Sequence, residues 1–152
     1  AEAVLSSPTL QYFGEVPVAK LRANAMESLD LQEKSLGPCE ARVVAMLFGD
    51  AKGGPGASAN RSVTAIDLGR NAMGDKATFH LVQTLKELDQ MREIGLAGCS
   101  VPPDAMRILA AFIRVSTHMQ ALDLRANHLS ADAVKQLNAA NASRPSKISI
   151  QF

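Results

Sequence analysis

Aromatic residues, an excess of one charge and long hydrophobic runs are all scarce in this 152-residue chain. Trp is absent, and there are one Tyr and five Phe, so a binding site built on an aromatic cluster is not expected. Lys and Arg number 16 against 15 Asp and Glu, and this net charge of +1 argues against nucleic-acid binding. The run from Ala105 to Val115 is interrupted by Arg107 and Arg114 and is too short to span a bilayer, so membrane insertion is not expected either.

Cysteine is rare as well. Cys39 and Cys99 are too few for a disulfide framework and no CxxC motif is present, which predicts an intracellular, reducing compartment, by default the cytoplasm. The first seven residues lack a starting Met and the layout of a signal peptide. The chain is therefore expected to be a processed protein or a fragment of a longer one, and an organelle stays open if a transit peptide has been removed.

A phrase repeated with a period of 28 residues is the most informative feature present. Three full copies begin at Val63, Met91 and Met119, and each reads apolar-x-x-Leu/Ile-x-Leu-x-x-Asn/Cys-x-apolar. A looser copy begins at Met26, and a terminal half-copy occupies residues 145–152. Each full copy alternates like a short strand and is followed by apolar residues at helical spacing. One strand and one helix cannot bury their apolar faces alone, so the units must stack on their neighbours.

This phrase resembles the leucine-rich repeat, and its period resembles the ribonuclease-inhibitor-like subclass, over residues 26–152. The resemblance implies an α/β solenoid with a curved parallel sheet on the concave side and helices on the convex side. It also implies that Asn71, Cys99 and Asn127 form a structural ladder, in which each side chain hydrogen-bonds backbone groups at the bend after a strand. Lys34 departs from this pattern in the first copy.

Helix-opening residues predict four helices, near residues 38–48, 75–89, 103–115 and 131–141. Residues 1–25 fit no copy and are expected to form an N-terminal cap, in which Ser7 and Pro8 open a short helix. A Gly-rich insert at 49–58 accounts for nine extra residues before the second copy and is expected to be a flexible loop. Lys52 precedes its glycines, which does not fit a phosphate-binding loop.

Candidate catalytic and metal-binding residues do not converge. His80, His118 and His128 fall at three different positions of the repeat, so stacking does not bring them together as metal ligands. Cys99 has no His or acid at a diagnostic spacing, and Cys39, at the start of the first helix, is expected to pack as a small apolar residue. The chain is therefore expected to be non-enzymatic and to use no metal or cofactor.

Variable strand positions form columns on the concave side. The central column is expected to hold Asp30, Asp67, Gly95, Asp123 and Ser149, and the flanking columns Gln32, Gly69, Ala97, Arg125 and Glu33, Arg70, Gly98, Ala126. On one interpretation these residues only keep the sheet soluble. On the other, charged residues contact a partner while Gly and Ala admit its backbone. The partner-binding residues would then be Asp30, Gln32, Glu33, Asp67, Arg70, Arg92, Glu93, Gln120, Asp123 and Arg125.

Two classes of function stay open. The first is a protein–protein interaction module or assembly subunit that binds a protein partner through the concave face and an exposed terminal strand. Removal of residues 146–152 is then expected to weaken partner binding or self-association. The second is a regulator of a small GTPase, since some GTPase-activating proteins use the same repeat subclass, and Arg70→Ala would then reduce stimulated GTP hydrolysis.

Overall fold

Strands and helices alternate along almost the whole of the described chain. The computed structural model describes residues 6–49 and 60–152, so the predicted Gly-rich insert lies outside the described residues apart from Gly49, which ends a helix. After a short helix, four strand–helix units and a last strand follow. In order these are α2 (Val18–Arg22), β1 (Ser28–Asp30), α3 (Pro38–Gly49), β2 (Ala65–Asp67), α4 (Asp75–Leu85), β3 (Glu93–Gly95), α5 (Pro103–Val115), β4 (Ala121–Asp123), α6 (Ala131–Ala142) and β5 (Ser149–Gln151).

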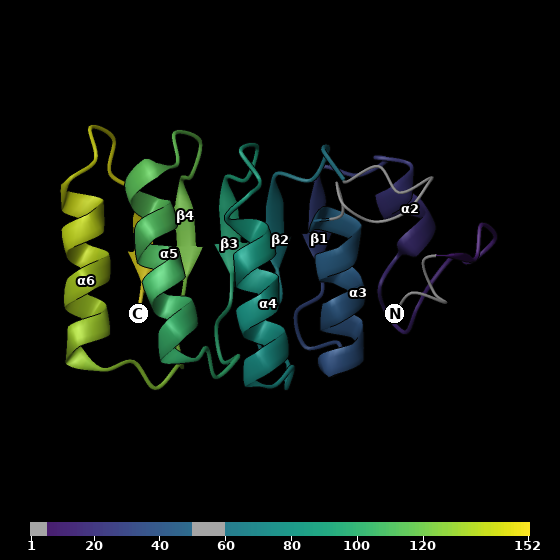
Figure 1. Ribbon diagram of the computed structural model, residues 1–152, viewed down its shortest axis with the longest axis horizontal. Helices are drawn as coiled ribbons and strands as arrows, with labels where there is room; N and C mark the ends of the chain where they lie inside the picture. The colour runs from purple at the N-terminus through teal and green to yellow at the C-terminus, as the bar shows by residue number, and fades with distance from the viewer. Residues whose placement is uncertain (1–5, 50–59) are drawn as a thin grey trace.

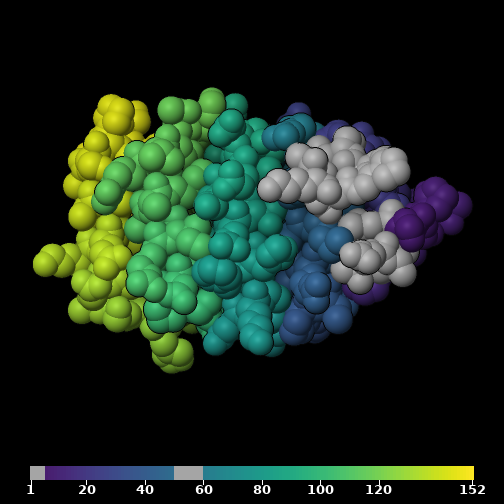
Figure 2. Space-filling model, in the orientation of Figure 1, coloured from purple at the N-terminus to yellow at the C-terminus, as the bar shows by residue number. Residues whose placement is uncertain are grey.

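All five strands are parallel and lie in the order of the sequence. Helices α3 to α6 stand side by side over one face of the sheet, and the chain advances by one strand and one helix at each step (Figure 1). In the space-filling view of the helix side, the successive units appear as bands of colour that follow the order of the chain (Figure 2). The opposite face of the sheet, which no described helix covers, is the concave face. None of the described helices has the length and apolar character needed to cross a membrane.

One apolar layer between sheet and helices forms the core. The register aligns Leu29, Ile66, Ile94, Leu122 and Ile150 across the five strands. The Leu two residues further along each unit, at Leu68, Leu96 and Leu124, is completely buried because it points away from the concave face. Burial of one such side chain stabilises the fold by about 1.5–3 kcal/mol. The repeated phrase therefore builds the core as a series of equivalent layers.

Helix bounds follow the sequence signals closely except at the end of α4. Helix α6 begins where the Ser130 hydroxyl accepts a hydrogen bond of 3.1 Å from the Ala133 amide, and α5 begins directly after Pro102. The predicted end of α4 near residue 89 is wrong, because the helix ends at Leu85. The Leu88 amide donates to the carbonyl of Leu85, and this tighter turn brings the Leu88 side chain into the core.

The N-terminal segment differs from the prediction in where its helix begins. Ser7 and Pro8 do not open a helix, since Ser7 has no regular structure and Pro8 lies in a turn. Instead, Phe13 and Val16 exchange two backbone hydrogen bonds of 3.0 Å, and α2 begins after Pro17. Three apolar side chains of this segment are fully buried against the first repeat, namely Val16, Val18 and Leu21.

Candidate functional site

Two rows of side chains cross the strands on the concave face. The aspartate row consists of Asp30, Asp67, Gly95, Asp123 and Gln151, and the small-residue row consists of Ser28, Ala65, Glu93, Ala121 and Ser149. The placement of Ser149 in the central column was wrong, because β5 pairs Gln151 with Asp123 and Ser149 with Ala121. Residues two apart on a strand face the same side of the sheet, so both rows lie on the concave face. The alternation of the sequence therefore does not indicate which of the two rows a residue such as Ser149 joins.

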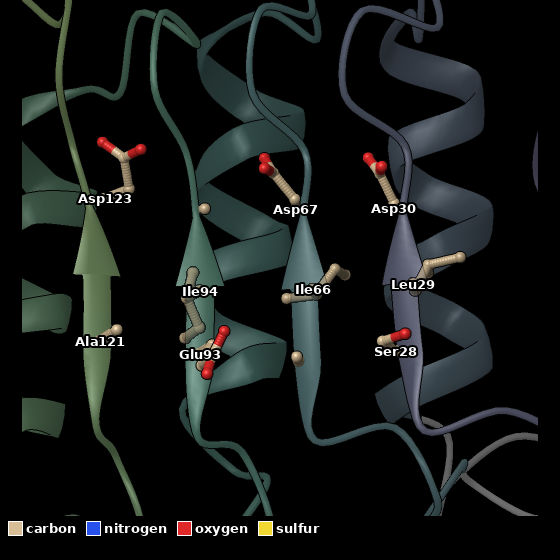
Figure 3. Close-up of a pocket in the computed structure, with 11 residues that line it drawn as sticks. Ser28, Leu29, Asp30, Ile66, Asp67, Glu93, Ile94, Ala121 and Asp123 are labelled. Carbon is tan, nitrogen blue, oxygen red and sulfur yellow. The ribbon is translucent and has the colours of Figure 1, made fainter.

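A shallow hollow of about 290 Å³ lies between these rows and spans β1 to β4. Figure 3 shows its carboxylates on four different strands, with Asp30, Asp67 and Asp123 in one row and Glu93 in the other. None of the residues that line it is cationic. Its lining is Ser28, Leu29, Asp30, Ala65, Ile66, Asp67, Glu93, Ile94, Gly95, Ala121 and Asp123. The sequence-predicted residues Asp30, Asp67, Glu93 and Asp123 are thus brought together.

Each aspartate in this row also stabilises the end of its own strand. The Oδ1 atom of Asp67 accepts a hydrogen bond of 2.8 Å from the Gly69 amide, and Asp30 and Asp123 accept equivalent bonds of 3.0 Å from the amides two residues on. This is the turn that Asp favours through its short side chain. The spacing of Asp before each bend was the available signal, and the sequence interpretation missed this structural role.

Asp123 forms the most extensive ion pair on the concave face. The Arg125 Nη2 atom lies 2.6 Å from Asp123 Oδ2, and the Arg125 Nε atom lies 3.0 Å from Asp123 Oδ1. The side-chain hydrogen bond from Arg125 lowers the pKa of Asp123. Asp123 is therefore the carboxylate of the hollow that an internal cation already neutralises.

The other predicted partner-binding residues lie outside the hollow. Arg70 forms an ion pair with Glu33 in the turns that follow β2 and β1, and both residues have a positive φ, 57° and 55°. Arg92 and Gln120 come before β3 and β4, where Gln120 donates a backbone hydrogen bond of 2.7 Å to the Arg92 carbonyl. Gln32 follows β1 at the level of the turn. The ten predicted residues therefore divide into four in the hollow and six around it.

The three ladder positions hydrogen-bond the bend of the preceding repeat. The Asn71 side-chain oxygen accepts from the Leu36 amide at 2.9 Å, and its Nδ2 atom donates to the Leu31 carbonyl at 2.8 Å. Asn127 makes the equivalent contacts to the third repeat, to the amide of Val101 and the carbonyl of Leu96. Asn71 of the second copy thus stabilises the bend of the first copy through these hydrogen bonds. Lys34 occupies the ladder position of the first copy, and the strand register between β1 and β2 is nevertheless intact.

The two cysteines have different surroundings. The Cys99 thiol donates to the Leu68 carbonyl at 3.1 Å, and burial raises the pKa of this thiol. A protonated thiol suits a hydrogen-bond donor and not a nucleophile. The expectation that Cys39 packs as an apolar residue was wrong, because Cys39 is exposed in the first turn of α3. Pro38 beside it is also exposed, whereas Ala41 in the same turn is buried.

Two buried polar residues have structural roles that the sequence interpretation missed. Asn60 accepts a hydrogen bond of 2.9 Å from the Val63 amide and donates one of 2.7 Å to the Leu21 carbonyl. Arg144 is 6% exposed, and its guanidinium donates to the carbonyls of Ile113, Ser116 and Met119. Asn60 and Arg144 lie three periods of 28 residues apart and so occupy equivalent positions of the repeat, which would have been the signal.

Metal-binding clusters are not found among the described residues, where no three His, Cys, Asp or Glu side chains are placed to hold an ion. A second hollow of about 450 Å³ lies on the helix side, at the N-terminal ends of α4 and α5. It is lined by Asp75, Lys76, Phe79, Pro102, Pro103 and Asp104. The concave hollow is the one that contains predicted site residues.

Comparisons with known proteins agree on the repeat. A family model described as "Leucine Rich repeat" matches residues 59–77 and 115–137. The human protein named NACHT, LRR and PYD domains-containing protein 2 is 35% identical over 77 residues, which cover 50% of this chain and 7% of that protein. The chain therefore spans a small part of the length of this relative.

A solved structure shares the architecture. The chain described as Leiomodin-1 Actin-Binding Site 2 superposes with a TM-score of 0.70 and 11% sequence identity, over 94% of this chain and 82% of that one. At this identity the likeness concerns the fold alone. The predicted fold class is confirmed: the described residues have the α/β fold of a leucine-rich-repeat solenoid, with a parallel sheet on one side and helices on the other.

Proposed function

We propose that this leucine-rich-repeat chain is a non-enzymatic interaction module or assembly subunit that binds a protein partner through its concave face. Leucine-rich repeats generally serve as protein–protein interaction modules. The observation that carries the proposal is the hollow across four strands, which brings four of the predicted partner-binding residues onto one uncovered sheet face. Its short floor residues, Ala65, Gly95 and Ala121, leave room for another chain to approach. We also propose that the chain belongs to the 28-residue ribonuclease-inhibitor-like subclass, because each of its four full units consists of a strand followed by a helix.

The chemistry of the face supports binding over catalysis. The carboxylates of Asp30, Asp67 and Asp123 each accept a backbone amide hydrogen bond, which suits fixed recognition groups. The Cys99 thiol is buried, and its pKa is raised by that burial. Fixed carboxylates on a sheet provide orientation and specificity for a partner.

The test compares a blocked concave face with a blocked helix face. Ala121→Tyr places a neutral ring in the hollow, and Ala139→Tyr places the same ring at an exposed position on α6. Binders would be selected from an unbiased peptide display library against the folded protein. We expect Ala121→Tyr to weaken the selected binders by about tenfold or more, and Ala139→Tyr to leave their affinity unchanged. Binders that respond only to Ala139→Tyr would contradict the proposal.

A further inference from the structure

Strand β3 reverses the pattern of its two neighbours on the concave face. On β2 and β4 a carboxylate stands in the aspartate row and an alanine in the small-residue row. On β3 the carboxylate Glu93 stands in the small-residue row and Gly95 takes the place of the aspartate. Gly95 thus has no side chain of its own between Asp67 and Asp123, and we call the space that these two carboxylates and Glu93 border the Gly95 notch. The three carboxylates are labelled in Figure 3.

The Gly95 notch depends on the missing side chain. A Cβ atom at Gly95 would lie 2.5 Å from Asp67 Oδ1 and 2.7 Å from Asp67 Cγ. The Asp67 carboxylate therefore leans over Gly95, and it is held there by the Gly69 amide. Asp67 and Asp123 stand on strands two spacings apart, about 10 Å between backbones. The side chain of an inserted residue would thus meet carboxylates from three strands.

Charge complementarity identifies the occupant. The hollow carries Asp30, Asp67, Glu93 and Asp123 and no cationic lining residue, and Arg125 engages Asp123 alone among the four. Anionic partners would be repelled, and the described residues form no metal cluster. The hollow's volume of about 290 Å³ lies at the lower bound of small-ligand pockets, about 300 Å³, so the acidic lining and not the volume selects the occupant.

We infer that the Gly95 notch receives a lysine or arginine side chain from an extended basic segment of a protein partner. This inference rests on the proposed function and names the partner's chemistry. The short residues Ser28, Ala65 and Ala121 let the backbone of the segment lie close to the sheet. Its cationic side chain then enters over Gly95, where charge-assisted hydrogen bonds to Asp67 and Glu93 are available.

The decisive variant restores the aspartate that β3 lacks. Gly95→Asp fills the notch and at the same time makes the face more acidic. The probe is a synthetic peptide of alternating glycine and lysine, and its binding is followed by chemical-shift changes in the labelled protein. We expect Gly95→Asp to weaken the lysine probe by about fivefold despite the added charge. Stronger binding would show that overall acidity attracts the probe, and would overturn the inference.

Removal of charge without a change in shape gives a second readout. Asp67→Asn with Glu93→Gln keeps the side-chain volumes and is expected to weaken the lysine probe by about tenfold. The matched control, Asp104→Asn with Asp132→Asn, removes two carboxylates from helix first turns and is expected to leave probe binding unchanged. Equal losses in the two double variants would overturn the inference. The comparison of these two double variants also tests the inference if Gly95→Asp does not fold.

Probe chemistry and library selection separate this inference from the proposed function. Peptides with norleucine or glutamate in place of lysine are expected not to shift concave-face resonances, and equal binding by either would overturn the inference. Library binders that Ala121→Tyr blocks are expected to be enriched in Lys and Arg. Blocked binders without that enrichment would overturn the inference and leave the proposed function standing. Binders that ignore Ala121→Tyr would remove both.

Discussion

At the scale of single residues, Asn71 contributes more to the fold than its polar character suggests. Asn71 is 3% exposed, and its side chain contacts the Leu36 amide and the carbonyls of Leu31 and Leu68. Asn71→Ala leaves these backbone groups without that partner, so we expect a loss of about 3 kcal/mol in the free energy of unfolding, measured by urea denaturation. Asn138→Ala at an exposed site on α6 is the matched control and should cost less than about 0.5 kcal/mol. Similar losses for both would contradict the ladder role.

Asp123 is a second single residue with a testable effect, because it makes the stability of the fold depend on pH. The Arg125 hydrogen bond lowers the pKa of Asp123 in the folded chain, while an unfolded aspartate has a pKa of about 3.9. The stabilisation is therefore complete above the unfolded pKa and is lost as the pH falls through the lower folded pKa. Arg125→Ala should make the drop in urea midpoint between pH 7 and pH 3 smaller than in the original chain. Arg114→Ala on α5 removes the same charge from the helix side and should leave that drop unchanged.

At the scale of elements, the sequence predicted what each repeat shares and missed what single units add. The repeated Leu and Ile positions and the helix-opening residues Pro103 and Ser130 determine the strands and the starts of α5 and α6. The end of α4 was placed four residues too late, because no Gly or Pro marks it and only the packing of Leu88 explains the turn. Asn60 stands at a repeat position, but its partner Leu21 lies in the N-terminal segment, which no repeat position indicates.

Arg144 shows how one residue joins neighbouring elements. It follows α6 and donates to three carbonyls at and beyond the end of α5, where the helix leaves its last carbonyls without intrahelical partners. We expect Arg144→Ala to lower the free energy of unfolding by about 3 kcal/mol, because buried carbonyls lose their donors. Arg144→Lys should recover only part of this loss, since lysine lacks the planar fork. Full recovery by lysine would mean that charge alone matters.

At the scale of the whole molecule, the concave face is the part that sequence columns describe least well. The period brought Asp30, Asp67 and Asp123 into one row, but it gave no indication that the Asp67 carboxylate leans over Gly95. It also gave no indication that Arg70 and Arg125, two of the predicted partner-binding residues, each form an ion pair with a carboxylate of the same surface. Side-chain direction depends on neighbouring strands, and one sequence does not encode it as a pattern.

Stacking predicts how a local defect spreads through the solenoid. Each helix packs on its neighbours in the series α3, α4, α5 and α6, so stability is close to a sum of units and nearest-neighbour interfaces. Leu124, which is completely buried, lies in the unit of β4 and α6, and Leu124→Ala should cost about 2–5 kcal/mol. Native-state hydrogen exchange should therefore show the largest loss of protection in α5 and α6 and the smallest in α3, with Leu31→Ala giving the opposite gradient. An equal loss of protection from α3 to α6 in both variants would mean that the chain unfolds as one cooperative unit. A loss of less than about 1 kcal/mol in the free energy of unfolding for Leu124→Ala would contradict the place of Leu124 in the core.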